Sequence, residues 1–589
     1  MRTIELPRGR YLSCAFRVAP NAGGQTRALL MRNRIFAQAG VRPDVLTLGA
    51  APDYDERRRI LLERGLLVDE IGLLNIYEHF REHGWGDRGG TGAPLADLGV
   101  HRIAEELRAD GSPWRVTYRV PDTRYALYDY LRADGSPYLR IPAFGLANGG
   151  SGRAAIQQVG HDGHVVGEYA TAGQWFRSWI RELAAGAERA FVFVDSRYVV
   201  PHVAPMRARR IHLIYVMHNV HVRPPFRWDS ETNTPYRRVL KRIGNLDALV
   251  TLTERQREDI AERNGRTSNM FVVPNPVDVP AASAAAPPRD PARVAVVARL
   301  EPQKRLGHAI AAFEQVVEAV PAARLDIYGQ GSRRAALQAE IDRRGLAGHI
   351  TLRGFEPQAR DALWTSSAFL MTSIFEGYPL STLESMNRGC PVVSYDIKYG
   401  PREQITDGVD GFLVPAGDRD ALARRVVELL RSPELVGRMS AAARDSASRY
   451  GPAEFLATWA GVLHSVVEQE PQRTRIDDVT LELTRLRTVR GGRLQLTGTL
   501  RVKGHSRRSP LTSADVRLAA IDVATGEVTE LPLKVEHVKN AFRIHTPANV
   551  FGPKLPAEAR LRLRCTWRNS AWETELPVAT ETLVCPAHA

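Results

Sequence analysis

Two glutamates, Glu376 and Glu384, stand eight residues apart in the stretch SIFEGYPLSTLESMNRGCPVVSYD. We predict that Ser381 caps a helix that begins after Pro379, with Glu384 one turn inside it. The free amides at a helix start bind anions, so those around Leu380–Thr382 could hold a diphosphate. Glu384 could then bond the hydroxyls of a ribose, and Glu376, ahead of the turn, could bond a sugar hydroxyl.

Each of these glutamates also has an explanation that needs no ligand. Ser-x-x-Glu is the pattern of a capping box, in which Glu384 would simply close the helix. Glu376 would then be an ordinary loop carboxylate. The sequence leaves both explanations open.

Two cations, Arg299 and Lys304, follow each other closely after an apolar run. Arg299 stands just past a predicted strand and Lys304 at the entry to a helix, at the sheet edge where ligands bind. Two positive charges there would neutralise a leaving diphosphate. Lys304 is the only lysine between Lys241 and Lys398 in an arginine-rich chain, which indicates that a compact ammonium group is needed. A solvated charged loop is the alternative.

Loops in three further places could approach the same ligand. Gly23 and Gly24 follow the first predicted strand, and a glycine pair lets the backbone come close to a phosphate or a sugar. His218 ends a buried strand and His221 follows it, so an imidazole could bond a transferred sugar or shuttle a proton. Gly329 belongs to the turn DIYGQGS, which lacks the third glycine of a dinucleotide fingerprint. A plain turn or packed histidines would account for the same residues.

Metal ligation is not favoured by the sequence. Asp-x-Asp pairs occur at Asp53 and Asp55 and at Asp418 and Asp420, and such pairs can hold a divalent metal beside a nucleotide-sugar. Asp418 is better explained as the N-cap of the helix ALARRVVELL, and Asp53 lies in a polar loop. The four cysteines are scattered without metal-ligand spacing. We therefore predict no metal and no cofactor.

The elements that must position these residues alternate along the chain. Residues 10–50 are predicted to form strand, loop, helix and strand, and residues 191–260 add apolar strands. Residues 293–460 alternate short apolar runs with amphipathic helices, which is typical of a parallel sheet covered on both faces. The prediction is an α/β protein with two Rossmann-like lobes joined by a linker at 280–292.

Two β-rich regions depart from this plan. The first carries the near-repeat LRADGSP twice, and Asp-Gly between alternating strands indicates hairpin turns. The second, at the C-terminus, suggests a β-sandwich-like domain. The predicted organisation is a first lobe (1–74 and 171–280), a β-rich insertion (75–170), a second lobe (293–453), a closing helix (454–470) and a C-terminal β domain (475–589).

Composition narrows the class of protein. With 589 residues, 44% of them hydrophobic, the chain is long enough for about three or four globular domains. We expect a cytoplasmic protein, because the N-terminus lacks an apolar core of signal-peptide length and no stretch is long enough to span a membrane. The net charge of +14 favours an anionic partner or reflects a coding bias towards arginine. Nucleic acid is not expected, since no recognition helix or stacking platform is found.

Together the motifs resemble the retaining glycosyltransferases of family four, which have the GT-B fold. Arg299 and Lys304 match the diphosphate-binding pair of that family, and Gly23-Gly24 matches its glycine loop. The resemblance covers residues 10–470. The E-x7-E signature of the family is matched, in order, by Phe375-Glu376-Gly377-x-Pro379-Leu380, Leu383-Glu384 and Gly389-x-Pro391-Val392-Val393.

This resemblance implies a UDP-linked sugar donor, held mainly by the second lobe without a metal, and an acceptor on the first lobe. Arg299 and Lys304 would stabilise the leaving diphosphate, while Glu376 and His218 would contact the sugar. The acceptor hydroxyl would attack the face from which the diphosphate departs, so that configuration is retained. The implied donor-binding residues are Gly23, Gly24, His221, Gly329, Gly377, Tyr378, Pro379, Leu380, Ser381, Thr382 and Glu384.

A narrower resemblance, in residues 394–415 and the β-rich insertion, is to the transferases that glycosylate poly(glycerol- or ribitol-phosphate) wall teichoic acid. It implies transfer of a hexose, glucose or N-acetylglucosamine, to an anionic polyol-phosphate acceptor. Peripheral contact with the inner face of the membrane stays open, as does a homo-oligomer, since that branch forms trimers through its β insertion. The alternatives are a protein O-glycosyltransferase, a UDP-sugar epimerase and a non-catalytic carbohydrate-binding protein. The sugar, the acceptor and the role of 475–589 are not determined by the sequence.

Overall fold

A computed structural model describes residues 4–576 of the chain with several gaps. The described residues divide into two compact units. One comprises residues 1–204 and 212–463, and the other comprises residues 205–211 and 464–589. The gaps are 21–22, 85–91, 97–98, 121–125, 143–155, 207, 209, 242, 244–245, 265–268, 278–286, 470–473, 490–492, 507–514, 523–527, 532, 539–540, 547–558 and 568–569.

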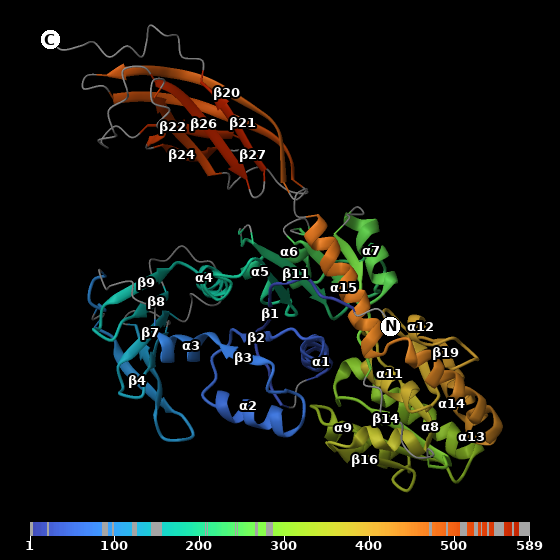
Figure 1. Cartoon of the computed structure of the whole chain (residues 1–589). Helices are drawn as coiled ribbons and strands as arrows, with labels where there is room; N and C mark the ends of the chain where they lie inside the picture. The colour runs from blue at the N-terminus through green and yellow to red at the C-terminus, as the bar shows by residue number, and fades with distance from the viewer. Residues whose placement is uncertain are drawn as a thin grey trace, which may run out of the picture. The chain divides into compact units, whose positions relative to one another are not determined.

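The first lobe is built on a seven-stranded sheet in the order β13-β12-β11-β10-β1-β2-β3 (Figure 1). Strand β1 runs parallel to both of its neighbours, β10 and β2. Strands β10 and β11 are apolar and buried along their whole length, as expected where helices cover both faces of a parallel sheet. The elements are β1 (Arg10–Ala15), α1 (Gly24–Gln38), β2 (Pro43–Thr47), α2 (Tyr54–Glu63), β3 (Gly72–Asn75), α3 (Ile76–His83), α4 (Ala172–Leu183), β10 (Ala190–Val194), α5 (Val200–Val203), β11 (Ile211–Met217), α6 (Thr234–Leu240), β12 (Ala248–Thr251), α7 (Glu254–Asn264) and β13 (Met270–Val272).

The second lobe has a six-stranded sheet in the order β16-β15-β14-β17-β18-β19, and each neighbouring pair is parallel. Helices pack against it around one hydrophobic core. The elements are β14 (Asp290–Val297), α8 (Leu306–Ala319), β15 (Arg324–Tyr328), α9 (Arg334–Arg343), β16 (Ile350–Gly354), α10 (Ala362–Thr365), β17 (Ser366–Met371), α11 (Leu380–Asn387), β18 (Val392–Asp396), α12 (Pro401–Gln404), β19 (Gly411–Pro415), α13 (Arg419–Arg431) and α14 (Pro433–Ser448).

These two sheets confirm the predicted α/β class with two Rossmann-like lobes. One boundary was predicted wrongly. The linker was placed at 280–292, but β14 already begins at Asp290, which pairs with Ser366 of β17. Proline and alanine there gave the segment a linker-like composition, whereas pairing with the neighbouring strand determines its structure.

The β-rich insertion forms a six-stranded antiparallel sheet in the order β4-β5-β6-β7-β8-β9. The two LRADGSP repeats form the predicted hairpin turns, between β4 and β5 and between β6 and β7. In each turn the aspartate, Asp110 or Asp134, accepts hydrogen bonds from the serine two residues later. The strands are β4 (His101–Leu107), β5 (Pro113–Arg119), β6 (Ala126–Leu131), β7 (Pro137–Pro142), β8 (Ile156–Val159) and β9 (Val165–Tyr169).

The C-terminal unit confirms the predicted all-β domain. Its strands form two four-stranded sheets, β20-β21-β25-β24 and β23-β22-β26-β27, whose neighbouring strands are antiparallel. Leucines and one phenylalanine, Phe542, from both sheets share a buried core. The strands are β20 (Thr474–Val489), β21 (Arg493–Ser506), β22 (Asp515–Asp522), β23 (Val528–Leu531), β24 (Lys534–Val538), β25 (Ala541–His545), β26 (Ala559–Trp567) and β27 (Ser570–Glu575).

Helix α15 (Pro452–Glu468) follows the second lobe and returns to the first. Its fully buried Trp459 meets Phe36 of α1 and Phe193 of β10 edge to face, with ring centroids 6.1 and 5.3 Å apart. Aromatic contacts of this kind add to the stabilisation from area burial, so the helix ties the two lobes together.

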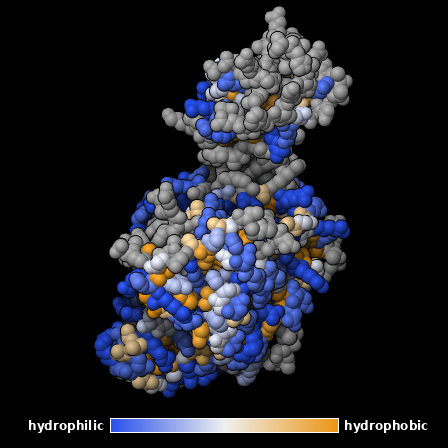
Figure 2. Space-filling view, turned by 90° about the vertical axis from the view of Figure 1, so that its left-hand side faces the viewer, coloured by the Kyte–Doolittle hydropathy of each residue, from blue (hydrophilic) through white to orange (hydrophobic). Residues whose placement is uncertain are grey.

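One face of the protein presents mainly polar side chains, with hydrophobic ones interspersed among them (Figure 2). Among the described helices, none is both long enough and apolar enough to cross a membrane.

Candidate active site

The predicted site residues of the two lobes meet where their sheets end. A Cβ atom built on Gly24 would lie 3.6 Å from Leu380, and one built on Gly23 would lie 3.9 Å from Nε of Arg299. The glycine loop of the first lobe therefore lies against the diphosphate-binding elements predicted in the second. The sequence places these segments far apart, and the fold brings them together as expected for ligand residues at strand ends.

Gly377 makes the tightest of these approaches. A Cβ atom there would lie 2.0 Å from the carbonyl oxygen of His218 and 2.9 Å from Cα of Asn219. Both neighbours are backbone atoms of the first lobe, which cannot move aside as a flexible side chain can. Glycine at this position therefore permits the two lobes to close on each other.

Lys304 and Glu376 form an ion pair within the second lobe. The Nζ atom lies 2.5 Å from Oε1 of Glu376, and the two side chains are only 17% and 11% exposed. Lys304 ends a short 3-10 helix just before α8, and its carbonyl oxygen accepts a hydrogen bond from Thr372. The ammonium group is thus held at a fixed place beside the start of the Glu376–Leu380 segment.

Arg299 differs from Lys304 because it is exposed and its guanidinium makes no hydrogen bond or ion pair with the described residues. It follows the carboxyl end of β14 and lies next to Gly23. A cation without a protein partner at this position can bind an incoming anion without breaking an existing pair.

Glu384 is buried and paired with two arginines. Oε1 accepts a hydrogen bond from Arg27 of the first lobe at 2.5 Å, and Oε2 lies 2.8 Å from Nε of Arg360. Burial raises the pKa of Glu384, but Arg27 and Arg360 outweigh this effect and hold the pKa below its usual value. The carboxylate is therefore charged and can accept further hydrogen bonds.

The structure corrects two predictions about the helix that carries Glu384. Helix α11 begins at Leu380 with Pro379 at the N-cap, and no side chain caps it, so Ser381 is not the cap. Glu384 does not close a capping box either, since its oxygens bond arginines instead. The first amides of α11 are consequently open to an anion, as an uncapped helix start requires.

Several side chains of this stretch point into the protein. Tyr378 is buried, with its ring 6.0 Å from that of Tyr450. Thr382 is fully buried and its hydroxyl bonds the sulfur of Met371. In this structure both can therefore contribute only main-chain atoms to donor binding.

Gly329 also has a backbone role. Its φ is +144°, and a Cβ atom there would lie 1.8 Å from the carbonyl oxygen of Ala298. The residue lets the β15 turn pass closely behind the Arg299 loop. It therefore supports the position of Arg299.

His218 follows β11 and bonds Asp195, which follows β10. Nε2 of the ring lies 2.8 Å from Oδ1 of Asp195, and both side chains are buried. Asp195 in turn pairs with Arg32 of α1 through two hydrogen bonds of 2.9 and 2.7 Å. Arg32 and Asp195 were not singled out from the sequence, although Asp195 follows an apolar strand just as His218 does.

The predicted donor contact of His221 is not supported. The ring is fully buried and lies nearly parallel to Tyr399 of the second lobe, with centroids 6.2 Å apart. Hydroxyl and ammonium groups of Tyr399 and Lys398 bond Asp259 nearby, at 2.6 and 2.5 Å. The HNVH motif thus divides into a histidine at the site and a histidine that packs between the lobes.

The burial of His221 predicts a pH-dependent stability. Burial lowers its pKa to about 4, so the folded protein holds a neutral ring while the unfolded chain binds a proton below about 6.5. Stability should therefore fall with pH between 6.5 and 4, by about 2 kcal/mol at pH 5. Denaturant unfolding of His221→Phe at pH 7 and 5 should show a smaller difference than the unchanged protein. The exposed His101→Phe should keep the full difference; an equal loss in all three proteins would contradict the prediction.

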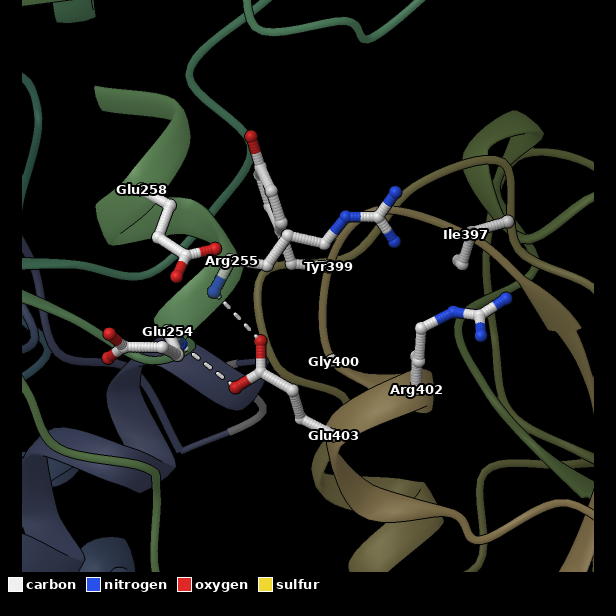
Figure 3. A pocket seen from close by; sticks show the side chains of 8 residues that line it. All are labelled: Glu254, Arg255, Glu258, Ile397, Tyr399, Gly400, Arg402 and Glu403. Carbon is white, nitrogen blue, oxygen red and sulfur yellow. Dashed lines mark hydrogen bonds between the residues drawn. The ribbon is translucent and has the colours of Figure 1, made fainter. Parts of the chain in front are cut away.

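Beside this packing lies a pocket of about 370 Å³ between α7 and the Ile397–Glu403 segment. Figure 3 shows the carboxylate of Glu403 directed at the start of α7. It accepts hydrogen bonds from the amides of Glu254 at 2.9 Å and Arg255 at 3.1 Å. A residue of the second lobe therefore caps a helix of the first, which the sequence alone does not indicate.

Replacing Glu403 with alanine should destabilise the protein by about 1 kcal/mol, because the amides of Glu254 and Arg255 lose their acceptor and α7 loses a charge that matches its dipole. The thermal midpoint measures this loss. Glu258→Ala is the matched control, since Glu258 lines the same pocket but is an exposed residue inside α7. Equal midpoints for the two variants would show that the cap does not stabilise the protein.

The aspartate pairs considered for metal binding have other contacts. Asp53 stands before α2 and pairs with Arg57 at 2.8 Å. Asp418 accepts a hydrogen bond from the amide of Ala421 and caps α13, as predicted.

Comparison with known proteins places the chain among sugar-transferring enzymes. Residues 282–446 match the family described as Glycosyl transferases group 1. The chain is 29% identical over 300 residues to the poly(glycerol-phosphate) alpha-glucosyltransferase of Bacillus subtilis (strain 168), covering 50% of this chain and 44% of the relative. It is 27% identical over 488 residues to the poly(ribitol-phosphate) alpha-N-acetylglucosaminyltransferase of Staphylococcus aureus (strain COL), covering 76% of this chain and 97% of the relative.

A solved structure extends this likeness to the fold. The chain resembles a mutant of S. aureus TarM in complex with fondaparinux, alpha-GlcNAc-glycerol and UDP, with a TM-score of 0.60 and 18% identity. The match covers 77% of this chain and 100% of that structure. The chain therefore has the GT-B fold and contains a group 1 glycosyltransferase domain at residues 282–446.

Proposed function

We propose that the protein transfers a hexose, glucose or N-acetylglucosamine, from a UDP-sugar to a hydroxyl of a polyol-phosphate polymer of the teichoic-acid type, with retention of configuration. The observation that carries the proposal is the grouping of Arg299, Lys304 and the open start of α11 opposite the Gly23-Gly24 loop. Two cations and a helix N-terminus form an anion site suited to a diphosphate.

Each residue of this site has its own role in the proposed reaction. Arg299, Lys304 and the first amides of α11 offset the negative charge that grows on the leaving diphosphate. Glu384, a charged carboxylate on the same helix that is held by Arg27 and Arg360, accepts hydrogen bonds from the ribose. Glu376 and His218 contact the transferred sugar. No metal or cofactor is needed in this scheme, because the protein itself supplies the positive charge.

Transfer with retention requires that bonds form and break on one face of the sugar. The bond from the anomeric carbon to the phosphate oxygen breaks, and the acceptor oxygen bonds to that carbon from the same side. The acceptor proton passes to an oxygen of the departing diphosphate, so the protein supplies no general base. The electrons of the broken bond leave with UDP.

The proposed acceptor rests on two observations. Two relatives, matched over 300 and 488 residues, act, by their names, on poly(glycerol-phosphate) and poly(ribitol-phosphate). The chain also carries a formal net charge of +14, which attracts a polymer with one phosphate per repeat. Contact with an anionic membrane surface would use the same charge.

A donor and acceptor screen tests the proposal. UDP-glucose and UDP-N-acetylglucosamine are incubated with glycerol-phosphate and ribitol-phosphate oligomers, and the products are weighed by mass spectrometry. The proposal expects one hexose added per transfer and UDP released in equal amount. Absence of transfer to every polyol-phosphate, with either donor, would overturn the proposed acceptor class.

Protein glycosylation is the second candidate. The chain is 28% identical over 186 residues to the UDP-N-acetylglucosamine–peptide N-acetylglucosaminyltransferase GtfA subunit of Streptococcus gordonii, which covers 30% of this chain. A serine-rich peptide added to the same screen separates the two candidates. Interconversion of UDP-sugars without any acceptor would instead indicate an epimerase.

A further inference from the structure

Three buried, polar side chains meet at the ends of neighbouring strands in the first lobe. Arg32 of α1 bonds both oxygens of Asp195, and Asp195 bonds Nε2 of His218. The three side chains are 3%, 0% and 7% exposed. We call this group the Arg32–Asp195–His218 relay.

The carboxylate of the relay is ionised. Burial raises the pKa of Asp195, but the charge of Arg32 and the hydrogen bond from His218 outweigh it and bring the pKa to about 2. Arg32 and Asp195 together carry no net charge. Arg32 is itself held by Ser13 at 3.0 Å and stacked 4.7 Å from the ring centre of Phe193.

This arrangement determines which ring nitrogen of His218 carries the proton. An ionised carboxylate can only accept hydrogen bonds, so Nε2 must donate. In the neutral ring the other nitrogen, Nδ1, is then a bare acceptor. Asp195 thus selects one of the two tautomers.

Nδ1 of His218 is buried and has no hydrogen-bond partner among the described residues. An unpaired buried acceptor costs about 1–3 kcal/mol, and a hydrogen bond from a ligand would offset that cost. The carbonyl oxygen of the same residue faces Gly377, directly after Glu376. The unpaired nitrogen therefore belongs to the residue that borders the proposed sugar site.

We propose that Asp195, oriented by Arg32, is a positioning residue that keeps His218 in the Nε2–H form, so that Nδ1 accepts a hydrogen bond from one hydroxyl of the transferred sugar. The inference rests on the proposed function and deepens it, because it assigns Asp195 and Arg32 a role in how His218 contacts the sugar. A carboxylate two contacts away from the ligand then contributes to donor specificity.

Asp195→Asn tests the relay. The asparagine amide can donate to Nε2, which moves the ring proton to Nδ1 and converts the acceptor into a donor. We expect transfer of the natural sugar to fall by roughly 10- to 100-fold, the effect of losing one buried hydrogen bond. The control is Asp44→Asn, which alters the more exposed Arg10–Asp44 pair of 3.0 Å elsewhere in the same sheet and should leave transfer unchanged.

A second readout separates positioning from a purely structural role. Monodeoxy analogues of the UDP-sugar are compared in kcat/KM with the intact donor. The unchanged protein should disfavour one analogue by roughly 10-fold or more, and Asp195→Asn should lose that preference. An equal loss with all donors would overturn the inference, as would an Asp195→Asn protein with full activity.

The outcome does not depend on the variant folding. Nitrogen-15 NMR of the unchanged protein reports the tautomer, with the His218 signal assigned by its loss in His218→Gln. A proton on Nδ1 would overturn the inference even if Asp195→Asn is unstable. Failure of the unchanged protein to use any UDP-sugar would instead contradict the proposed function and leave the tautomer result standing.

Discussion

Replacing Lys304 with alanine is expected to lower kcat by about 100-fold or more, with a smaller change in KM. The ammonium group lies at the entry to α8, 2.5 Å from Glu376, where it can meet charge that appears only as the diphosphate leaves. An interaction made mainly in the transition state affects turnover more than ground-state binding. Steady-state transfer with the preferred donor and acceptor measures the effect.

The Lys304 experiment needs controls, because the variant leaves Glu376 mostly buried without its partner. Thermal midpoints of each variant show whether the fold persists. Lys304→Arg keeps the charge but spreads it over a planar group, so it should recover part of the activity. Lys241→Ala, at an exposed position after α6, should behave like the unchanged protein. Unchanged turnover in a folded Lys304→Ala protein would remove Lys304 from the mechanism.

The fold could be predicted from the sequence because its strands are buried on both faces. Runs such as residues 190–194 and 211–217 contain almost no polar residue. The segments between such runs place their hydrophobic residues at helical spacing. The insertion could be predicted for a different reason, since both Asp-Gly turns set the hairpins locally. The linker boundary was misplaced because strand pairing at Asp290 depends on a partner 76 residues away in the chain.

The site was predictable only in part, because its pairings are not local. Glu384 could be located as the second glutamate of its motif, but its partner Arg27 stands 357 residues earlier. Ser381 fits the composition of an N-cap, yet the helix starts two residues sooner, at Leu380 after Pro379 with its extended backbone. Asp195 carried a usable signal: it directly follows an apolar strand, as His218 does. Strands β10 and β11 are neighbours in the sheet, but the local sequence does not determine the order of strands in a sheet.

Gly377 connects these distant segments, which leads to the second large effect. Gly377→Ala is expected to lower turnover by about 100-fold, because the added carbon would lie 2.0 Å from the His218 carbonyl oxygen. Backbone of the second lobe cannot then approach backbone of the first, and a displacement of about 1 Å misaligns Glu376, His218 and the donor. Overpacking should also cost about 1–3 kcal/mol of stability.

The matched control is Gly437→Ala on α14, where an added carbon meets nothing within 4 Å. It should leave transfer unchanged and stabilise the helix by about 0.5–1 kcal/mol. Rates at saturating donor, together with thermal midpoints, separate a defect of lobe closure from loss of fold. Full turnover by Gly377→Ala would mean that the lobes need not meet this closely for transfer, and that Glu376 and His218 act on the sugar independently of each other.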